Sequence, residues 1–316
     1  MHRITASHRR IATAVTAVLA ATLGAATLSA PAATAATAPA TPVTWHDFNG
    51  NGTPDIIIDD HAWPQATLVD TKYDPATGKI TADDWDLTDL DTDTLSASLN
   101  VATGNLGGSA VGDFVSRDTA GVLQLRKGRG DGTFTAPIRV GTGWNTYKEL
   151  VGGSDVTGDG KPDLLGVSKA TGELFLHTGT GKDTAPFLAA RKNLGKGWGV
   201  YNSVAGVGNI AGGPAGDVVA IDSYGTAWLH LGKGDGTFAP RTRISTGWGD
   251  YRGVFGVGDI NRDGHPDLIG RGFHYHDDVA LKVHLGTGDW RAPFKNTAPQ
   301  EIGLWGDGIP YLPRPF

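Results

Sequence analysis

Three nine-residue loops of the 316-residue chain place oxygen-bearing side chains at alternating positions around a glycine. They are the loops 47–55, 155–163 and 259–267. Each stretch has side-chain oxygens at loop positions 1, 3, 5 and 9, with Gly at position 6. Ca²⁺ takes about six to eight hard oxygen ligands, and a tight turn with alternating Asp, Asn and Thr brings such oxygens to one point. The pattern therefore predicts three Ca²⁺ sites. Their expected ligands are Asp47, Asn49, Asn51, Asp55, Asp155, Thr157, Asp159, Asp163, Asp259, Asn261, Asp263 and Asp267.

The loops differ from an EF-hand in their length and in the segment that comes after them. An EF-hand loop is longer, ends with Glu and continues into a helix. These loops end with Asp at position 9 and continue into the apolar, strand-like segments 56–58, 164–167 and 268–270. Asp, Asn and Gly also form ordinary turns, which is the alternative to a metal site. Because Pro-Asp closes all three loops, we favour hairpins clamped by a structural rather than a catalytic Ca²⁺.

Two degraded copies of the loop lie between the three good ones. They span 104–113 and 208–217, and each keeps the closing Asp but lacks the middle oxygens. Loop copies therefore start at positions 47, 105, 155, 209 and 259, with spacings of 50 to 58 residues. We expect the degraded copies to keep the same backbone turn without a metal.

Two further motifs recur with a similar period. A Gly-x-Gly-Asp-Gly-Thr-Phe turn occurs at 128–134 and again at 232–238. A Gly-Trp-x-x-Tyr motif occurs three times. Its aromatic pairs are Trp144 and Tyr147, Trp198 and Tyr201, and Trp248 and Tyr251. A fixed period of about 50 residues with several short β segments in each unit predicts a radial or solenoid β-array.

Each unit is consistent with four strands. In the last copy we expect them at 253–258, 267–271, 279–285 and 298–304. The mature region has no amphipathic helical stretch, and 47 Gly with 17 Pro suit many turns. Four-stranded sheets repeated around an axis are the blades of a β-propeller, which leaves only short protected edges. The sequence therefore predicts an all-β propeller.

The loops and their spacing resemble the FG-GAP/VCBS repeats of the integrin α-subunit N-terminal propeller superfamily. The aromatic and turn motifs make the chain similar to secreted bacterial proteins built from such repeats. The likeness covers residues 43–316 and implies a calcium-stabilised propeller, although one scaffold hosts many functions. Five units are visible, which favours five blades, as in tachylectin-type propellers. The seven blades of integrins are the alternative, because the insertion 62–100 has room for further strands.

The N-terminus has the three parts of a secretory signal. Arg3, Arg9 and Arg10 precede the apolar, Ala-rich segment 11–28, and Ala-Thr-Ala at 33–35 is a small-residue cleavage site. A membrane anchor is the alternative, but the core is weakly hydrophobic and no stop-transfer pattern is present after it. We expect export by the general secretory or the twin-arginine route, and a secreted protein. The expected organisation is a signal peptide at 1–35, a linker at 36–43 and the propeller at 44–316.

Net charge and cysteine content exclude some classes of partner and of stabilising cross-link. Removing the leader takes away three arginines and no acid, which changes the formal net charge from −6 to −9. A nucleic-acid-binding surface needs clustered Lys and Arg, so nucleic acid is not an expected partner. The chain has no cysteine, which excludes disulfides and zinc–thiolate sites. Stability is therefore expected to come from the core, ring closure and bound Ca²⁺.

Histidines also recur with the repeat. His177, His230 and His284 occupy equivalent positions, and their spacing predicts separate blades rather than one shared metal site. We interpret them as interior or surface histidines with ordinary hydrogen-bonding partners. His274 and His276 are closer together and could ligate a transition metal, but a solvated loop is the preferred interpretation.

Function is less constrained than fold. The Trp–Tyr pairs are expected either to pack between blades or to offer equivalent platforms on which sugar rings stack. Enzyme motifs such as Gly-x-Ser-x-Gly and His-Glu-x-x-His are missing, so no catalytic residue is assigned. We favour a monomeric binding module for a carbohydrate or cell-envelope ligand. The alternatives are a polysaccharide lyase or hydrolase with paired carboxylates in the propeller channel, and an integrin-like protein-adhesion module.

Overall fold

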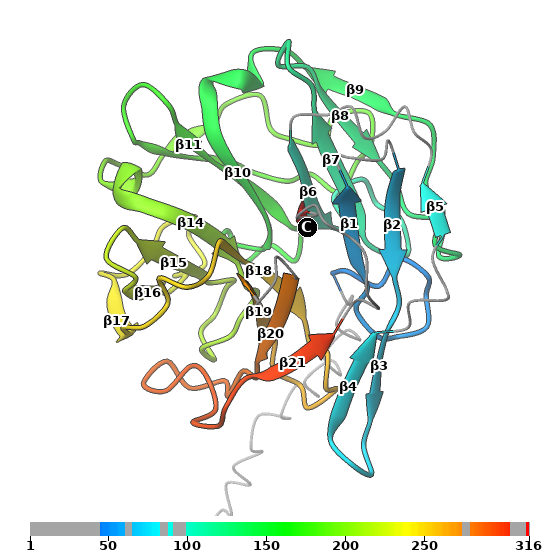
Figure 1. Cartoon of the computed structure of the whole chain (residues 1–316). Coiled ribbons are helices and arrows are strands. Elements are labelled where there is room, and N and C mark those ends of the chain that lie inside the picture. The colour runs from blue at the N-terminus through cyan, green and yellow to red at the C-terminus, as the bar shows by residue number, and fades with distance from the viewer. Residues whose placement is uncertain are drawn as a thin grey trace, which may run out of the picture. The chain divides into compact units, whose positions relative to one another are not determined.

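The repeat units fold as antiparallel sheets in the computed structural model (Figure 1). The structure describes residues 45–60, 65–82, 88–90, 99–273, 279–303 and 314–315. These residues all belong to one compact unit, Thr41–Phe316. The expected signal peptide, the linker and the pair His274 and His276 lie outside the described residues. Within the described ranges we find no helix with the length and apolarity that a membrane crossing needs.

Four sheets each consist of four consecutive strands in antiparallel order. The strands of the first two are β6 (Leu99–Gly104), β7 (Asp113–Arg117), β8 (Leu123–Arg126), β9 (Ile138–Gly141), β10 (Tyr147–Ser154), β11 (Asp163–Ser168), β12 (Leu174–His177) and β13 (Lys192–Asn193). The strands of the next two are β14 (Tyr201–Gly206), β15 (Val218–Asp222), β16 (Ala227–His230), β17 (Thr242–Ser245), β18 (Gly253–Gly258), β19 (Asp267–Phe273), β20 (Val279–His284) and β21 (Gln300–Gly303).

The first repeat unit forms a sheet that joins the two ends of the described chain. Its order is β22-β1-β2-β5, so the C-terminal strand β22 pairs antiparallel with β1. A separate hairpin, β3–β4, lies within the insertion of the first unit, and β4 contacts β21. The strands are β1 (Ile56–Asp60), β2 (Gln65–Val69), β3 (Thr71–Asp74), β4 (Lys79–Ala82), β5 (Thr88–Leu90) and β22 (Arg314–Pro315).

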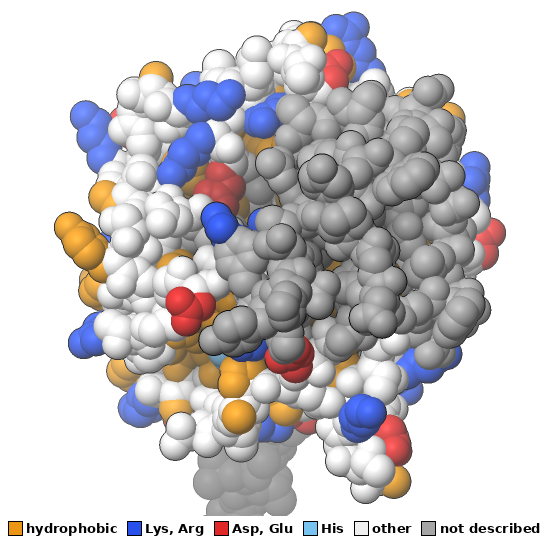
Figure 2. All heavy atoms as spheres, in the orientation of Figure 1, with side chains coloured by type: hydrophobic (Ala, Val, Ile, Leu, Met, Phe, Trp, Pro, Cys, Tyr) orange, Lys and Arg blue, Asp and Glu red, His pale blue; other side chains and the backbone are white. Residues whose placement is uncertain are grey.

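The sheets are arranged radially. The first strands β6, β10, β14 and β18 lie next to one another in sequence order, and the later strands of each sheet lead outward (Figure 1). Radially arranged four-stranded antiparallel sheets are the blades of a β-propeller. The prediction of an all-β propeller with four-stranded blades is therefore confirmed. On the part of the face in Figure 2 that is not grey, basic and acidic side chains are interspersed.

Glycines allow the innermost strands to approach closely. A Cβ atom added at Gly152, Gly206 or Gly256 would lie 2.0 to 2.2 Å from a backbone oxygen of the preceding inner strand. A side chain at any of these repeat-equivalent positions would push two blades apart. The ring of inner strands is therefore tight because the sequence places Gly where neighbouring backbones meet.

Trp45 lies at the axis, a position that the sequence did not predict. A Cβ atom added at Gly104, Gly153 or Gly208 would lie 3.3 to 3.5 Å from its indole ring. These glycines lie at or near the ends of the inner strands of three successive blades, and all three have positive φ. Trp45 is thus the side chain around which these blades converge.

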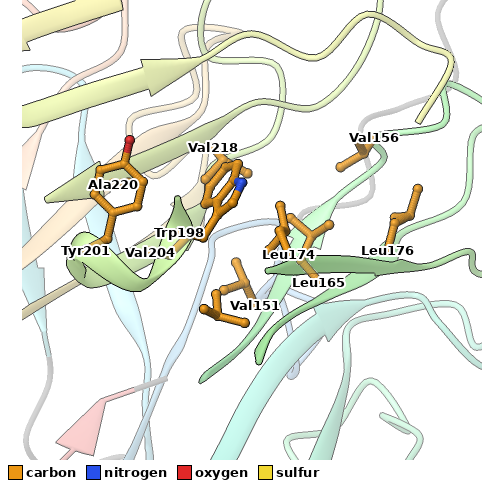
Figure 3. Close-up of a cluster of buried hydrophobic side chains, with 11 residues drawn as sticks. Val151, Val156, Leu165, Leu174, Leu176, Trp198, Tyr201, Val204, Val218 and Ala220 are labelled. Carbon is orange, nitrogen blue, oxygen red and sulfur yellow. The ribbon is translucent and has the colours of Figure 1, made fainter. Parts of the chain in front are cut away.

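Neighbouring blades pack through hydrophobic clusters. In the cluster of Figure 3, side chains of β10–β12, such as Leu165 and Leu174, face Trp198, Tyr201 and Val204 of the next unit. Strand alternation supplies these contacts, because Leu174 and Leu176 of β12 are buried while the intervening side chain is partly exposed. The large aromatic residues therefore contribute to the packing between sheets.

Candidate functional site

The loop predicted to bind metal folds around its first Asp. Asp155 accepts hydrogen bonds from the backbone N–H groups of Gly158 and Gly160, each at 2.7 Å. Asp47 and Asp259 accept equivalent bonds in their own loops at 2.7 to 3.0 Å. These bonds stabilise the turn, because each carboxylate satisfies the amides of the tight loop.

The closing Asp has a role that sequence reasoning missed. Asp163, predicted as a metal ligand, is 1% exposed. It accepts N–H bonds from Val156 at the start of its loop and from Gly179 in the next hairpin, both at 2.9 Å. Burial raises its pKa to about 6, although the backbone bonds oppose that shift. The carboxylate therefore joins two turns of one blade.

The same bonds occur in the degraded copies. Asp217 accepts N–H bonds from Ala211 and Gly232 at 3.0 and 2.9 Å. Asp113 accepts equivalent bonds from Gly107 and Gly128. Asp55 and Asp267 accept the corresponding bonds at the start of their loops. Because the bonds form whether or not the middle oxygens are present, the closing Asp is a backbone clip. The sequence signal for this role was its retention in the degraded loops.

The middle positions retain donor chemistry that suits Ca²⁺. Thr157 Oγ1 lies 3.2 Å from Asp155 Oδ1, and the side chains of Asn261 and Asp263 are 3.0 Å apart. Such clustered hard oxygens fit Ca²⁺ better than a softer metal. Among the residues that the structure describes, however, no group of three His, Cys, Asp or Glu side chains is placed to hold a metal ion.

Lysines lie against two of these carboxylates. Lys295 Nζ is 2.8 Å from Asp263, and Lys161 Nζ is 3.0 Å from Asp159. Both pairs are partly exposed, so each contributes little to the free energy of folding. An ion bound at either loop would have to compete with an ammonium group for the position-5 carboxylate.

The Gly-Trp-x-x-Tyr motifs build a second repeated cluster. In each motif a Gly with positive φ precedes Trp, and Tyr lies at the start of an inner strand or beside it. Trp198 stacks on His230 with ring centroids 4.3 Å apart, and Tyr201 Oη lies 2.9 Å from His230 Nε2. The other two clusters have the same arrangement. They comprise Trp144, Tyr147 and His177, and Trp248, Tyr251 and His284.

The histidines are thus partners of the aromatic pairs. Sequence reasoning placed them at one repeat-equivalent position but assigned no partner to them. Their nearly constant distance from the Trp–Tyr motif was the signal that could have linked the two, and only the pairing of strands brings them into contact.

Burial limits what the indoles can bind. Trp144, Trp198 and Trp248 are 9%, 7% and 6% exposed. One face of each indole lies against an imidazole ring. Stacking on a sugar needs an accessible ring face, so a ligand could reach only an edge of these rings. The packing interpretation accounts for this burial, whereas the prediction of sugar platforms stays a prediction.

The three imidazoles are expected to stay neutral well below pH 6. Burial lowers the pKa of His177, His230 and His284 from 6.5 to about 4. The unfolded chain binds these protons near pH 6.5, so the three groups lower the stability of the fold as pH falls from about 6.5 towards 4. Histidine-ring NMR of the folded protein measures this directly. Titration of His230 near pH 6.5 would contradict the expectation.

A pocket of about 470 Å³ opens beside the first aromatic cluster. Trp144, Tyr147 and His177 form part of its wall, and residues 184–189 form another part. Arg139 of β9, in the neighbouring blade, also lines it. The pocket is therefore built from two adjacent blades.

Arg191 fixes the polar side of this pocket. Its guanidinium carbon lies 4.0 Å from the centroid of the Phe175 ring, and Arg191 Nη1 donates a hydrogen bond to Tyr147 Oη. The cation–π contact and the hydrogen bond hold the guanidinium group in one orientation. In the next blade Arg241 repeats this arrangement over Trp228 and Tyr201.

Comparison with known families identifies the repeat. The model of the FG-GAP-like repeat family matches residues 215–270, which include the clip Asp217, the Trp248 motif and the loop 259–267. The match covers less than half of the chain. Together with the radial four-stranded sheets, it supports a propeller that contains an FG-GAP-like repeat.

Three solved structures are similar in fold to this FG-GAP-repeat propeller. A lectin from Agrocybe aegerita, described as specifically recognising non-reducing terminal N-acetylglucosamine, is 16% identical with a TM-score of 0.39. The match covers 74% of this chain but only 63% of that lectin, which is less than two thirds of its length. AofleA from Arthrobotrys oligospora is 12% identical with a TM-score of 0.38, covering 80% of this chain and 67% of that one.

A mutant of AofleA in which three arginines are replaced by alanine is 11% identical, with a TM-score of 0.39 and coverage of 85% and 76%. A comparison with curated proteins gave no match. At such identities and scores, the ligands of these proteins do not transfer to the present chain.

The axis of this FG-GAP-repeat propeller holds a smaller cavity of about 160 Å³. It is lined by the inner strands β6, β10, β14 and β18 and by His46. Burial raises the pKa of Glu149 to about 7, and Glu149 accepts a hydrogen bond from Val204 N–H at 2.9 Å. Of the described residues that line the cavity, Glu149 alone has a carboxylate. A glycosidase site needs two, so these residues do not form the paired-carboxylate site of the enzyme alternative.

Proposed function

We propose that this FG-GAP-repeat propeller is a carbohydrate-binding module whose ligand site is the pocket beside Trp144. The observation that carries the proposal is the pocket itself, which has a volume of about 470 Å³ and a mainly polar lining that also includes Phe187 and Leu188. Small-ligand sites have volumes of roughly 300–1,000 Å³ and few, well-placed polar groups.

The lining suits a sugar ring. Phe187 and Leu188 offer apolar surface on which C–H groups can pack. Thr142, Thr184 and Arg191 offer hydroxyl and guanidinium groups that can bond sugar hydroxyls. Leu188 is 55% exposed, so apolar surface remains accessible at the site.

A glycan array with calorimetry of the hits tests the site. Ala189 lines the pocket and its neighbour Ala190 does not, although both are exposed. We expect Ala189→Trp to fill the pocket and abolish glycan binding, and Ala190→Trp to bind as the parent protein does. Absence of any glycan ligand, or equal binding by both variants, would refute the proposed site.

We also propose that the ring has five blades. The support is the antiparallel pairing of β22 with β1, which completes a four-stranded sheet for the first unit beside the four sheets of consecutive strands. Pairing of this kind closes a ring and removes an exposed sheet edge. An experimental structure with more than five blades would overturn this count.

We propose Ca²⁺ as a structural ligand of the three intact loops, on the strength of their hard oxygen donors. The ion would be held by the side chains at loop positions 1, 3 and 5, while the closing Asp retains its bonds to the backbone. Binding to the folded state alone stabilises it by about 2.7 kcal/mol at a free Ca²⁺ concentration of 100 times Kd.

Chelation should therefore lower the melting temperature, and added Ca²⁺ should restore it. Calorimetric titration should show one site fewer in Asp159→Ala, because that variant removes a middle oxygen of one loop. Ser109→Ala, in a degraded loop, is the control and should leave the stoichiometry unchanged. A melting curve that is the same in EDTA and in Ca²⁺ argues against structural calcium.

Export is proposed from the leader alone. The expected mature N-terminus is at or near Ala36, after the small-residue site at 33–35. Sequencing the N-terminus of protein recovered from the culture medium checks this. Recovery of a membrane-bound species that retains Met1 would reverse the proposal.

A further inference from the structure

The pocket beside Trp144 differs in charge from the chain that contains it. The formal net charge of the chain is −6. Among the described residues that line the pocket, the charged side chains are Arg139 and Arg191, and none is acidic. A pocket whose described charged side chains are all cationic favours an anionic ligand, because protein walls of low dielectric constant strengthen the positive field inside it.

The two arginines differ in how they are held. Arg191 is already oriented by Phe175 and Tyr147. A guanidinium group has five N–H donors, so this contact leaves a planar edge for another acceptor. Arg139 is exposed on β9, and among the described residues its side chain has no hydrogen-bonding or ion-pair partner. The site therefore combines one guanidinium group held by Phe175 and Tyr147 with a second, exposed one on the neighbouring blade.

This combination is not a general feature of the repeat. Arg139 lies five residues before its Trp, and the equivalent residue before Trp198 is Asn193. The equivalent before Trp248 is Arg243. In that third cluster, however, the position that corresponds to Arg191 is Pro299. Arg191 lies two residues before Asn193, which pairs with Phe175. Likewise, Pro299 lies two residues before Glu301, which pairs with Lys282. Of the three described clusters, only the one at Trp144 has arginine at both of these positions.

We propose that the pocket beside Trp144 recognises an acidic sugar, with the carboxylate of a uronic-acid residue paired to Arg139 and Arg191. This inference rests on the proposed carbohydrate site and names its ligand class. Guanidinium groups bind carboxylates through paired, charge-assisted N–H···O bonds. The ring carbons of the sugar pack against Phe187 and Leu188, which also line the pocket.

The test asks whether binding depends on the carboxylate of the sugar. Disaccharides of glucuronic, galacturonic and mannuronic acid are compared with their methyl esters, which keep the shape of the sugar and remove its charge. We expect at least one acid to bind, and its ester to bind at least about 10-fold more weakly, since the charged pair is lost. Raising the salt concentration should weaken binding of the acid and leave that of the ester unchanged.

Two arginine variants test whether Arg139 itself binds the carboxylate of the acidic sugar. Arg139→Gln should weaken binding of the acid by about 10-fold or more and leave the melting temperature unchanged, because this side chain is exposed. Arg243→Gln is the matched control, since Arg243 is also exposed and occupies the corresponding position of β17. It should bind the acid as the parent protein does.

The outcomes separate this inference from the proposed function. If the parent protein bound the acid and its methyl ester with equal affinity, the proposed carboxylate pairing would be wrong. The same holds if Arg139→Gln bound the acid as tightly as the parent protein does. Tighter binding of a sulfated disaccharide than of any uronic acid would overturn the ligand class. Neutral oligosaccharides that bind the parent and fail to bind Ala189→Trp would leave the carbohydrate site standing and refute its acidic ligand. Absence of all sugar binding would refute both.

Discussion

Replacing Trp198 by alanine is expected to lower the free energy of unfolding by about 3–5 kcal/mol, as truncation of a packed aromatic side chain does. Trp198 is 7% exposed and stacks on His230 at 4.3 Å. It also packs with side chains of the preceding blade, among them Val151 and Leu165 (Figure 3). The change therefore leaves a cavity between two blades. Denaturant unfolding of the parent and the variant measures the loss.

Trp290 provides the control for this prediction. It is 40% exposed, and Trp290→Ala should change the free energy of unfolding by less than about 1 kcal/mol. Glycan binding is to be measured on the same samples. If Trp198→Ala were as stable as the parent but bound glycan poorly, the packing interpretation would be wrong and the sugar-platform prediction would be supported.

Asp217→Ala is expected to destabilise the fold by about 2–4 kcal/mol, because it leaves two buried backbone N–H groups without an acceptor. These are the amides of Ala211 and Gly232, which now bond to the carboxylate at 3.0 and 2.9 Å. The loop that Asp217 closes lacks the middle oxygens of a calcium site. The loss should therefore be the same in EDTA and in Ca²⁺.

Asp163→Ala extends this comparison to a loop with the complete oxygen pattern. As a clip, Asp163 should contribute a similar free energy in EDTA, where no metal is bound. The exposed Asp235 is the control, and Asp235→Ala should leave the free energy of unfolding nearly unchanged. A large loss for Asp163→Ala in Ca²⁺ with none in EDTA would show that Asp163 acts through a metal and not as a clip.

Local features were predictable because contiguous residues encode them. The strand expected at 253–258 is β18 with those bounds, and the strand expected at 267–271 is β19, which runs to Phe273. The edge strand expected at 298–304 is found at Gln300–Gly303, and residue 304 lies outside the described residues. Turn residues and alternation fix such elements within a few positions. The repeat period then indicates that the elements form blades.

The candidate site was only partly predictable. The Trp–Tyr pairs were recognised as a repeated feature, but their histidine partners were not, because His177 reaches Tyr147 only through the pairing of β10, β11 and β12. The closing Asp was predicted as a metal ligand because it is the last of the four oxygen-bearing side chains in its loop. Its bond to the next hairpin, from Gly179 N–H to Asp163, became evident only in the folded blade.

The sequence by itself determined the all-β class, the four-stranded unit, the repeated turns and the FG-GAP-like repeat, since each depends on residue types at short spacing. Only the tertiary structure showed which side chains lie at the axis and which line the pocket between two blades. Trp45 lies at the axis because glycines of three blades leave room for its indole. Arg139 and Arg191 share one pocket because adjacent blades pack side by side. Contacts between residues so distant in sequence depend on how the blades close around the axis, and no local pattern specifies that geometry.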